Sequence, residues 1–339
     1  MPADLSQLIE VSARIGADPL LVQGPGGNTS LKVDDEIWVK ASGTWLAEAG
    51  DRPIFAGLNL SQARSRLAEN MDADLSGARI AGAEDLRPSI ETALHVLMPH
   101  RAVLHAHAVG AMTVSVLADG EARARRALAE LDWAWIPYHR PGAPLAEAIA
   151  RVLQGTVADV LILQNHGVVV GADTPAAAER RLAAVEARLA FPVRDLGALP
   201  PDGAREEPGF EALASLSGLA LDAAAREIVT RTPLIPDQVV FLGGAIPLVG
   251  RDETLAVASD RVERGSGVAP AVLLKPGAGM FGRRGRSAAA DSVVGAIYEI
   301  ARRIPDDATV QGLPEGAIAA LLGWDAESYR IALAQTRTV

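Results

Sequence analysis

Two short histidine strings, each at the end of an apolar run, constrain this chain more than any other feature. His105 and His107 follow the apolar pair Val103-Leu104, and His166 follows the apolar run 160–163. Residues i and i+2 of an extended strand point to the same face, so the first two can bind one metal ion together. If the fold adds His166, three protein ligands leave a coordination position open, which is typical of a catalytic metal site.

The rest of the composition narrows the ligand chemistry. The chain has no Cys, which excludes disulfides and thiolate ligands and leaves nitrogen and oxygen donors. We expect the three histidines outside the strings, His95, His100 and His139, to be ordinary core or surface side chains. Imidazole ligation suits Zn²⁺ first, with Co²⁺ or Mn²⁺ as alternatives.

Charge and hydropathy exclude several classes of protein. The 32 basic and 42 acidic side chains give a net charge of −10 with no long basic run, so neither nucleic acid nor an anionic membrane is an expected partner. No apolar run reaches about 18 residues, so no membrane span is expected. The N-terminus shows no signal-peptide pattern, and a cytoplasmic protein is therefore the expectation.

A change of character near residue 194 predicts two domains. The stretch 194–208 is rich in Pro, Gly and charged residues. We therefore predict a catalytic domain over 1–195, a linker over 196–209 and a small α/β extension over 210–339.

Apolar periodicity and turn residues predict the elements of both domains. In the first they are helices over 4–14, 61–70, 90–97 and 175–190, a hairpin over 29–40, and strands over 102–106 and 160–164. In the second they are helices over 211–230, 287–303 and 314–322, and strands over 238–242 and 271–275. The Gly- and Arg-rich stretch 277–286 is interpreted as a solvated basic turn. A phosphate cradle is the alternative, but the stretch lacks the Gly-Lys-Ser/Thr end of a P-loop.

Five short strings follow one another along the first 195 residues. They are Gly26-Gly27-Asn28-Thr29-Ser30, Ser42-Gly43, Pro88-Ser89-Ile90-Glu91, His105-Ala106-His107 and Asn165-His166-Gly167. In this order and at about this spacing they resemble the class II aldolase/adducin family, and the resemblance covers residues 1–195. That family includes zinc-dependent fuculose- and rhamnulose-1-phosphate aldolases and ribulose-5-phosphate 4-epimerases.

The resemblance implies a fold and an assembly. The implied fold is an α/β/α sandwich around a mainly antiparallel sheet, with the smaller C-terminal α/β extension added. The implied assembly is a homotetramer with cyclic symmetry and an active site at the subunit interface. The strands predicted from periodicity do not by themselves show antiparallel pairing.

The chemistry follows from the three histidines. Retro-aldol cleavage leaves a carbanion beside a carbonyl, and this carbanion must be stabilised as an enediolate. A divalent metal held by neutral His105, His107 and His166 keeps its full charge and acts as a Lewis acid on the substrate oxygens. A Lys Schiff base is then unnecessary.

A base is needed beside the metal, and Glu91 is the candidate. In the aldolases that the chain resembles, the Glu at this place binds the metal or leaves it to transfer a proton. The resembled epimerases carry Asp there, so Glu91 favours C–C cleavage. The alternative is an exposed helix carboxylate.

Small residues predict an anion site for the substrate. Amide, hydroxyl and backbone N–H groups can bind phosphate, and glycines let the backbone approach it. The alternative is ordinary turn chemistry. Phosphate-using relatives often have a second Ser where this chain has Ile90, so Lys40 and Arg87 would have to add charge, or the ligand is a carboxylate. The four candidate residues are Asn28, Ser42, Gly43 and Ser89.

Tyr138 is the candidate acid. It precedes the string 139–143, which matches a family segment whose Tyr reaches the site of a neighbouring subunit. A phenol within hydrogen-bonding reach could protonate the departing aldehyde oxygen. The alternative is a buried Tyr with a satisfied hydroxyl.

We therefore expect a metal-dependent aldolase that cleaves a small, phosphorylated ketose through a metal-stabilised enediolate. A sugar-phosphate epimerase or a decarboxylase that uses the same enolate chemistry is the first alternative. An adducin-like interaction module without catalysis is the second, although such a module needs no metal ligands.

Overall fold

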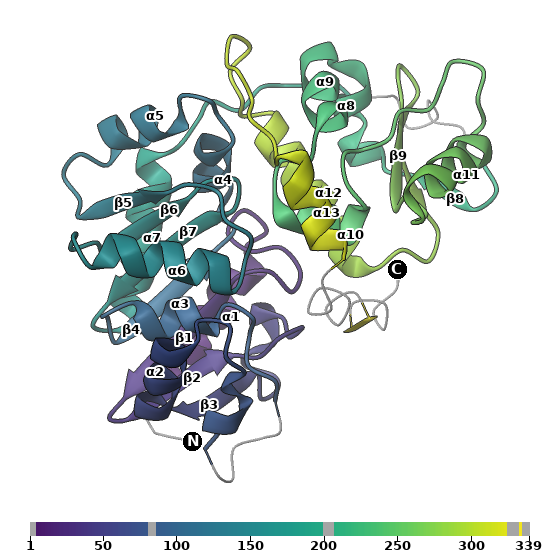
Figure 1. The fold of residues 1–339 in the computed structure, drawn as a ribbon. Helices are drawn as coiled ribbons and strands as arrows, with labels where there is room; N and C mark the ends of the chain where they lie inside the picture. Colours follow the sequence, from purple (N-terminus) through teal and green to yellow (C-terminus); the bar gives the residue numbers. More distant parts are fainter. Residues whose placement is uncertain (1–4, 81–85, 199–206, 324–331, 334–339) are drawn as a thin grey trace. The chain divides into compact units, whose positions relative to one another are not determined.

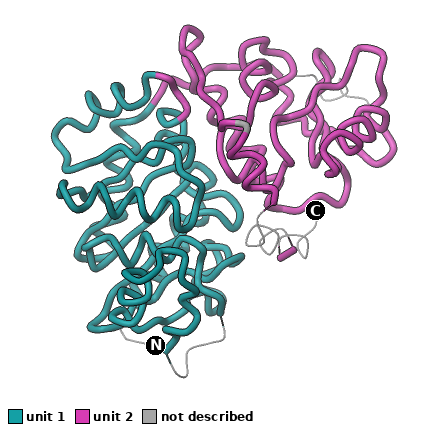
Figure 2. The backbone as a smooth tube through the Cα atoms, viewed as in Figure 1, with its two compact units in different colours: residues 1–115, 119–190 teal, residues 116–118, 191–339 magenta. Residues whose placement is uncertain are grey.

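The structure is a computed structural model that describes residues 5–80, 86–198, 207–323 and 332–333 (Figure 1). It divides into two compact units (Figure 2). Unit 1 comprises Met1–Ser115 and Asp119–Ala190, and unit 2 comprises Val116–Ala118 and Phe191–Val339. Most of the predicted linker, residues 199–206, lies outside the described residues, and the predicted division at 195 and 210 stays a prediction.

Unit 1 is built on a seven-stranded sheet with the strand order β3-β2-β1-β4-β7-β6-β5. Every neighbouring pair is antiparallel except β5 and β6, so the expectation of a mainly antiparallel sheet is confirmed. The predicted hairpin is β1 and β2, which turn at Asp34 with a positive φ of 51°. The strands are β1 Asn28–Val33, β2 Glu36–Lys40, β3 Phe55–Asn59, β4 Ala102–Ala106, β5 Trp133–Ile136, β6 Val160–Leu163 and β7 Gly167–Ala172.

Helices cover both faces of this sheet (Figure 1). Ser12 on α1 is bonded to Thr29, whereas His95 on α3 is bonded to Ser30. Neighbouring residues of a strand point to opposite faces, so α1 and α3 lie on opposite sides of β1. Helices α4 and α7 share the layer of α1, and α6 packs beside α3. The helices are α1 Leu5–Ala17, α2 Leu60–Glu69, α3 Thr92–Leu97, α4 Val109–Ser115, α5 Gly120–Ala127, α6 Ala143–Leu153 and α7 Pro175–Arg188, with 3₁₀ helices at Leu46–Glu48 and Leu75–Ala78.

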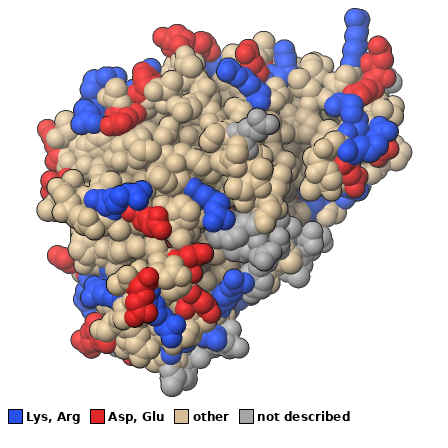
Figure 3. Space-filling view, viewed as in Figure 1, with Lys and Arg blue, Asp and Glu red and all other residues tan. Residues whose placement is uncertain are grey.

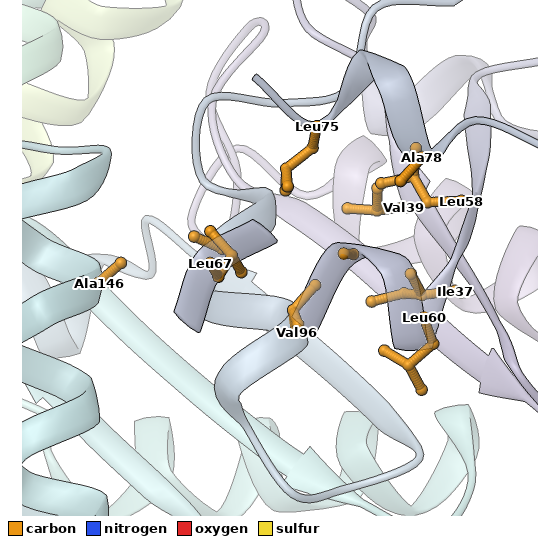
Figure 4. Packing of buried hydrophobic residues seen from close by; sticks show 11 residues of the cluster. Ile37, Val39, Leu58, Leu60, Leu67, Leu75, Ala78, Val96 and Ala146 are labelled. Carbon is orange, nitrogen blue, oxygen red and sulfur yellow. The ribbon is translucent and has the colours of Figure 1, made fainter. Parts of the chain in front are cut away.

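Core packing holds α3, the element that carries Glu91. A helix of six residues is too short to be stable by itself, so tertiary contacts must hold it. Val96 packs with Ile37 and Leu58 of the sheet and with α2 (Figure 4), and Leu94 and Met98 pack with β4 and α6. Each fully buried side chain of this size stabilises the fold by about 1.5–3 kcal/mol. The start of α3 is thereby fixed against the sheet.

Unit 2 is a smaller α/β body, as expected. Its three strands are antiparallel in the order β8-β10-β9, and Phe210, Leu255, Leu273 and Phe281 belong to its core. Its elements are β8 Phe210–Ala212, β9 Val272–Lys275, β10 Gly279–Arg283, a 3₁₀ helix Ala214–Leu216, α8 Gly218–Leu221, α9 Ala223–Arg231, α10 Pro236–Leu242, α11 Leu255–Ser266, α12 Ala288–Ala301 and α13 Glu315–Leu322.

One prediction in unit 2 is wrong, and two are wrong in part. The strand predicted over 238–242 is part of α10, a helix whose residues are all buried, so no polar alternation reveals its period. The helix predicted over 211–230 is wrong at its start, where β8 lies. From Ala214 on, the segment is helical but broken into a 3₁₀ helix, the short α8 and, after the cap at Asp222, α9. The stretch 277–286 is a solvated basic turn only at its exposed residues 283–285, because β10 occupies 279–283 and the side chain of Arg286 is buried.

The surface carries charges of both signs. Lys and Arg are interspersed with Asp and Glu on the face drawn in Figure 3. Among the described helices, none has the length and hydropathy needed to cross a bilayer.

Candidate metal centre

The structure brings the three predicted histidines together. Strands β4 and β6 are both antiparallel to β7, so they run in the same direction and end at the same edge of the sheet. His105 and His107 lie at the end of β4, and His166 lies in the turn between β6 and β7. All three are buried, and one ring nitrogen from each lies within 4.8 Å of the others. This edge therefore offers three converging nitrogen ligands.

Unusual backbone geometry explains the residues that flank these histidines. Asn165 adopts a left-handed conformation with φ of 55°, which Asn tolerates better than most residues. A Cβ at Gly167 would lie 2.4 Å from the carbonyl oxygen of Ala106, and one at Gly27 would lie 2.9 Å from that of His105. Glycine at both positions lets the neighbouring chain segments approach β4 closely.

The Glu91 carboxylate faces two of the histidines. Oε2 lies 3.5 Å from His105 Nε2, and Oε1 lies 3.4 Å from His166 Nε2. Charge-assisted hydrogen bonds are shorter, at about 2.7–2.9 Å. Two ligand atoms that each lie about 2.1 Å from one ion at a tetrahedral angle are about 3.4 Å apart. The spacing therefore fits side chains that share a metal ion.

The tautomer of His105 also fits a shared metal ion. His105 Nδ1 lies 3.1 Å from the carbonyl oxygen of Val168, which can only accept, so Nδ1 carries the hydrogen. The lone pair is then on Nε2, on the side of Glu91. A metal-binding His commonly donates its other N–H to a carbonyl in this way.

The carboxylate is ionised despite its burial. Burial raises the pKa of Glu91, but positive charge at the three-histidine site and the amide of Asn28 outweigh burial and lower the pKa to about 2. A carboxylate that is charged at neutral pH can bind a cation or accept a proton.

His95, which the sequence analysis did not single out, supports Glu91 through Asn28. Asn28 Nδ2 lies 2.8 Å from Glu91 Oε2, and Asn28 Oδ1 contacts His95 Nε2. Burial is the largest cause that lowers the pKa of His95, to about 3, so its ring is neutral. His95 was expected to be an ordinary core side chain. Its position four residues after Glu91, one helical turn away, is the signal that could have identified it.

The predicted anion-site residues lie near one another, but their bonds differ from the expectation. Asn28 uses its amide on Glu91, His95 and Ser89, so it holds the base instead of facing an anion. Ser89 Oγ also accepts the backbone N–H of Glu91 at 3.2 Å. The backbone N–H of Ser42 donates to the carbonyl of residue 87, which places the Ser42-Gly43 turn beside Ser89. Anion binding by Ser42, Gly43 and Ser89 stays a prediction.

Lys40 does not supply the extra charge that an anion would need. Its ammonium donates to the carbonyls of Pro25 and Gly27 at 2.7 and 2.9 Å and is buried there. Lys40 therefore stabilises the loop before β1. Arg87 is exposed.

Tyr138 lies just after β5. Its backbone N–H donates to Gln164 Oε1 at 3.1 Å, which links it to the turn that carries His166. Its hydroxyl is buried without a hydrogen-bond partner among the described residues, and burial raises the pKa of Tyr138 to about 12. The phenol is therefore neutral at physiological pH and able to donate.

One cavity of about 250 Å³ is formed by unit 2 alone, between α9 and the segment 305–310. None of the predicted site residues lines it. The candidate metal centre, in contrast, is built from residues of unit 1.

Comparisons with known proteins place residues 6–191 in one family model, the class II aldolase and adducin N-terminal domain. The chain is 30% identical over 190 residues to the uncharacterized oxidoreductase YuxG of Bacillus subtilis (strain 168), a match that spans 51% of this chain and 27% of YuxG. The chain thus spans about a quarter of the length of this relative.

Two solved structures are also similar. One is the N-terminal class II aldolase domain of a conserved Thermoplasma acidophilum protein, with 25% identity, a TM-score of 0.48, and coverage of 56% of this chain and 93% of that one. The other is YgbL of Klebsiella pneumoniae, a putative aldolase/epimerase/decarboxylase, with 20% identity, a TM-score of 0.41, and coverage of 55% and 86%.

Proposed function

The chain belongs to the class II aldolase and adducin family, and from this premise we propose that it is a metal-dependent aldolase that cleaves a small ketose. The observation that carries the proposal is the buried set His105, His107 and His166 with the ionised Glu91 beside it. Zn²⁺ is the proposed metal, because imidazole ligands suit it well. When bound, it supplies Lewis-acid stabilisation of negative charge on the substrate oxygens.

Two proton transfers accompany the cleavage, and we assign one to Glu91 and one to Tyr138. In cleavage, the substrate hydroxyl loses its proton as the C–C bond breaks, and the ketone carbon gains one. Glu91 is the proposed group that exchanges the proton of the carbon, and the burial of its carboxylate beside His105 and His166 supports this role. Tyr138 is the proposed partner of the aldehyde oxygen. In the condensation direction its neutral phenol donates the proton that this oxygen gains, and in cleavage the corresponding phenolate takes the same proton back.

The substrate is proposed to be phosphorylated, with Ser42, Gly43 and Ser89 as donors to the phosphate. Ile90 adds no donor, and Lys40 is occupied by loop carbonyls. The number of phosphate contacts is therefore small, and a carboxylate in place of phosphate is the alternative.

A product analysis tests the reaction. Purified, zinc-loaded protein is incubated with ketose 1-phosphates and with their unphosphorylated forms, and aldehyde release is measured. We expect an aldehyde from at least one ketose 1-phosphate and none with His166→Ala. An epimerised sugar or CO₂ without aldehyde would replace the aldolase proposal with the epimerase or the decarboxylase.

The assembly is proposed from family membership. We propose a cyclic homotetramer whose interface completes the site with Tyr138 from a neighbouring subunit. Light scattering at micromolar concentration should give four times the mass of the chain. A monomer mass with full aldolase activity would contradict the shared site.

A further inference from the structure

A line of buried contacts leads from β1 through α3 to the candidate base. Ser30 Oγ lies 2.7 Å from His95 Nδ1, and His95 Nε2 contacts Asn28 Oδ1. Asn28 Nδ2 then lies 2.8 Å from Glu91 Oε2. All four residues are buried, His95 and Ser30 completely. The line therefore lies in a medium of low polarity, where hydrogen bonds are strong and mutually polarising.

With the His95 ring neutral, only one arrangement of hydrogens satisfies every contact. The carboxylate only accepts, so the amide nitrogen of Asn28 faces Glu91. The amide oxygen only accepts, so His95 carries its hydrogen on Nε2. His95 Nδ1 then keeps a lone pair and accepts from the Ser30 hydroxyl. The opposite orientation of the amide would set its oxygen against the carboxylate, so all three donors point toward Glu91.

The fold fixes the members of this line. Asn28 is the direct cross-strand partner of His105 in the β1–β4 pairing, and Ser30 lies two residues further on the same face. Glu91 is the N-cap residue of α3, and His95 lies one helical turn after it. The carboxylate, its support and the first ligand thus share one rigid framework.

The line makes the two oxygens of Glu91 different. Oε2 accepts from Asn28, whereas Oε1 accepts no hydrogen bond among the described residues and lies 3.4 Å from His166 Nε2. A proton that arrives on Oε1 leaves Oε2 able to accept the same bond. Proton exchange at Oε1 therefore requires no rearrangement of the line, which is the condition for a preorganised base.

We propose that His95, acting through Asn28, is a positioning residue that holds Glu91 Oε2 so that Oε1 exchanges the proton with the substrate. The assignment of that proton rests on the proposed function. The orientation of the line does not, and the two are tested separately.

The orientation is tested on the metal-free chain by long-range ¹⁵N–¹H spectra at pH 7. We expect His95 as the neutral tautomer with hydrogen on Nε2 and a free lone pair on Nδ1. Ser30→Ala should shift the Nδ1 resonance of His95. The matched control is Ser12→Ala, which removes a buried hydroxyl pair with Thr29 on the other face of β1 and should leave that resonance unchanged. An Nδ1–H tautomer or an imidazolium would overturn the proposal, whatever the reaction of the enzyme.

The positioning role is tested with zinc-loaded variants of His95. His95→Leu should lower kcat about 10- to 100-fold, the usual effect of losing a residue that orients a site, with KM and zinc content retained. His95→Gln keeps an N–H donor and should recover part of that loss, and Ser12→Ala should equal the wild type. If His95→Leu does not fold, the comparison of His95→Gln with Ser30→Ala replaces it, and a fall of kcat in Ser30→Ala is expected. Wild-type kcat in a folded His95→Leu or in Ser30→Ala would refute the role. If the wild type releases no aldehyde, the proposed function fails, and the tautomer still decides the orientation.

Discussion

Two buried charges, one in each unit, are held in opposite ways. The Arg286 side chain of unit 2 is 4% exposed, and its guanidinium binds Glu211, Asp291 and the carbonyl of Arg283. The Glu91 side chain of unit 1 is 8% exposed. Asn28 donates to one of its oxygens, while the other faces His166.

The two charges differ in how fully their hydrogen-bonding atoms are paired. Burial lowers the pKa of Arg286, but its bonds to Asp291 and Glu211 outweigh burial and raise the pKa. The guanidinium nitrogens bind two carboxylates and a carbonyl of the same chain, so the cluster stabilises unit 2. Glu91 is charged as well, yet one of its oxygens keeps capacity for a further atom. A complete cluster indicates a structural role, and an incomplete one indicates chemistry.

The largest expected effect is on turnover, and it comes from changing the Glu91 carboxylate. Glu91→Gln keeps size and hydrogen bonding but loses basicity, so turnover should fall about 10²–10⁴-fold. Exchange of the ketone product's α-proton with solvent deuterium should slow in parallel, while zinc content and fold are retained. Near wild-type exchange would show that another residue moves this proton.

The second largest expected effect is on zinc affinity, and it comes from removing a histidine ligand. His166→Ala removes one of three nitrogen donors, and zinc affinity should fall about 100- to 1,000-fold, since structural sites gain about 10–16 kcal/mol from four ligands. Titration against a chromophoric chelator measures this. The control is His139→Ala, which changes a His outside the triad. Unchanged stoichiometric zinc in His166→Ala would contradict the ligand assignment.

The complete cluster should respond in stability. Arg286→Met leaves Glu211 and Asp291 without their shared partner, and the free energy of unfolding should fall by about 2–3 kcal/mol. This is less than for a fully buried pair, because both carboxylates are about 30% exposed. Urea unfolding measures it, with the exposed Arg284→Met as control. If Arg286→Met unfolds at the same urea concentration as the wild type, the structural role of the Arg286 cluster is contradicted.

Lys32 gives an effect that is small near pH 7 and grows with pH, and it sharpens the comparison. Its ammonium is buried against the carbonyls of Met98 and His100, and burial lowers the pKa of Lys32 to about 7. Between pH 7 and the unfolded value of 10.5, the unfolded chain binds more protons, so stability should rise with pH. The slope is at most about 1.4 kcal/mol per pH unit. Melting temperatures of wild type and Lys32→Met at pH 6, 7.5 and 9 should diverge accordingly, and parallel curves would argue against a shifted Lys32.

The sequence predicted the parts of the site that depend on local patterns. His105 and His107 share a face because strands have a period of two, and His166 follows an apolar run that was predicted to be a strand. That the fold brings His166 to the other two was an expectation which the periodicity alone did not give. The role of His95 could not be read in this way. It depends on how a six-residue helix lies on β1, which only tertiary packing decides.

The fold shows the same limit. The antiparallel sheet followed from the family resemblance, since strand periodicity does not give pairing. In unit 2, where no resemblance helped, the segment 238–242 was assigned to a strand and is helical. A segment that is buried all round shows no polar face, and length and the flanking Pro236 and Gly243 are then the better guides.

The contact at Gly167 has a consequence for engineering. The distance between β4 and the start of β7, directly after His166, is set by main chain against main chain, with no room for even a methyl group at this point. Libraries that vary core side chains should therefore leave the spacing of these two strands beside the three histidines unchanged. Attempts to change the preferred metal have to alter the turn at Asn165-His166-Gly167 itself, where a single added carbon would force the two strands apart.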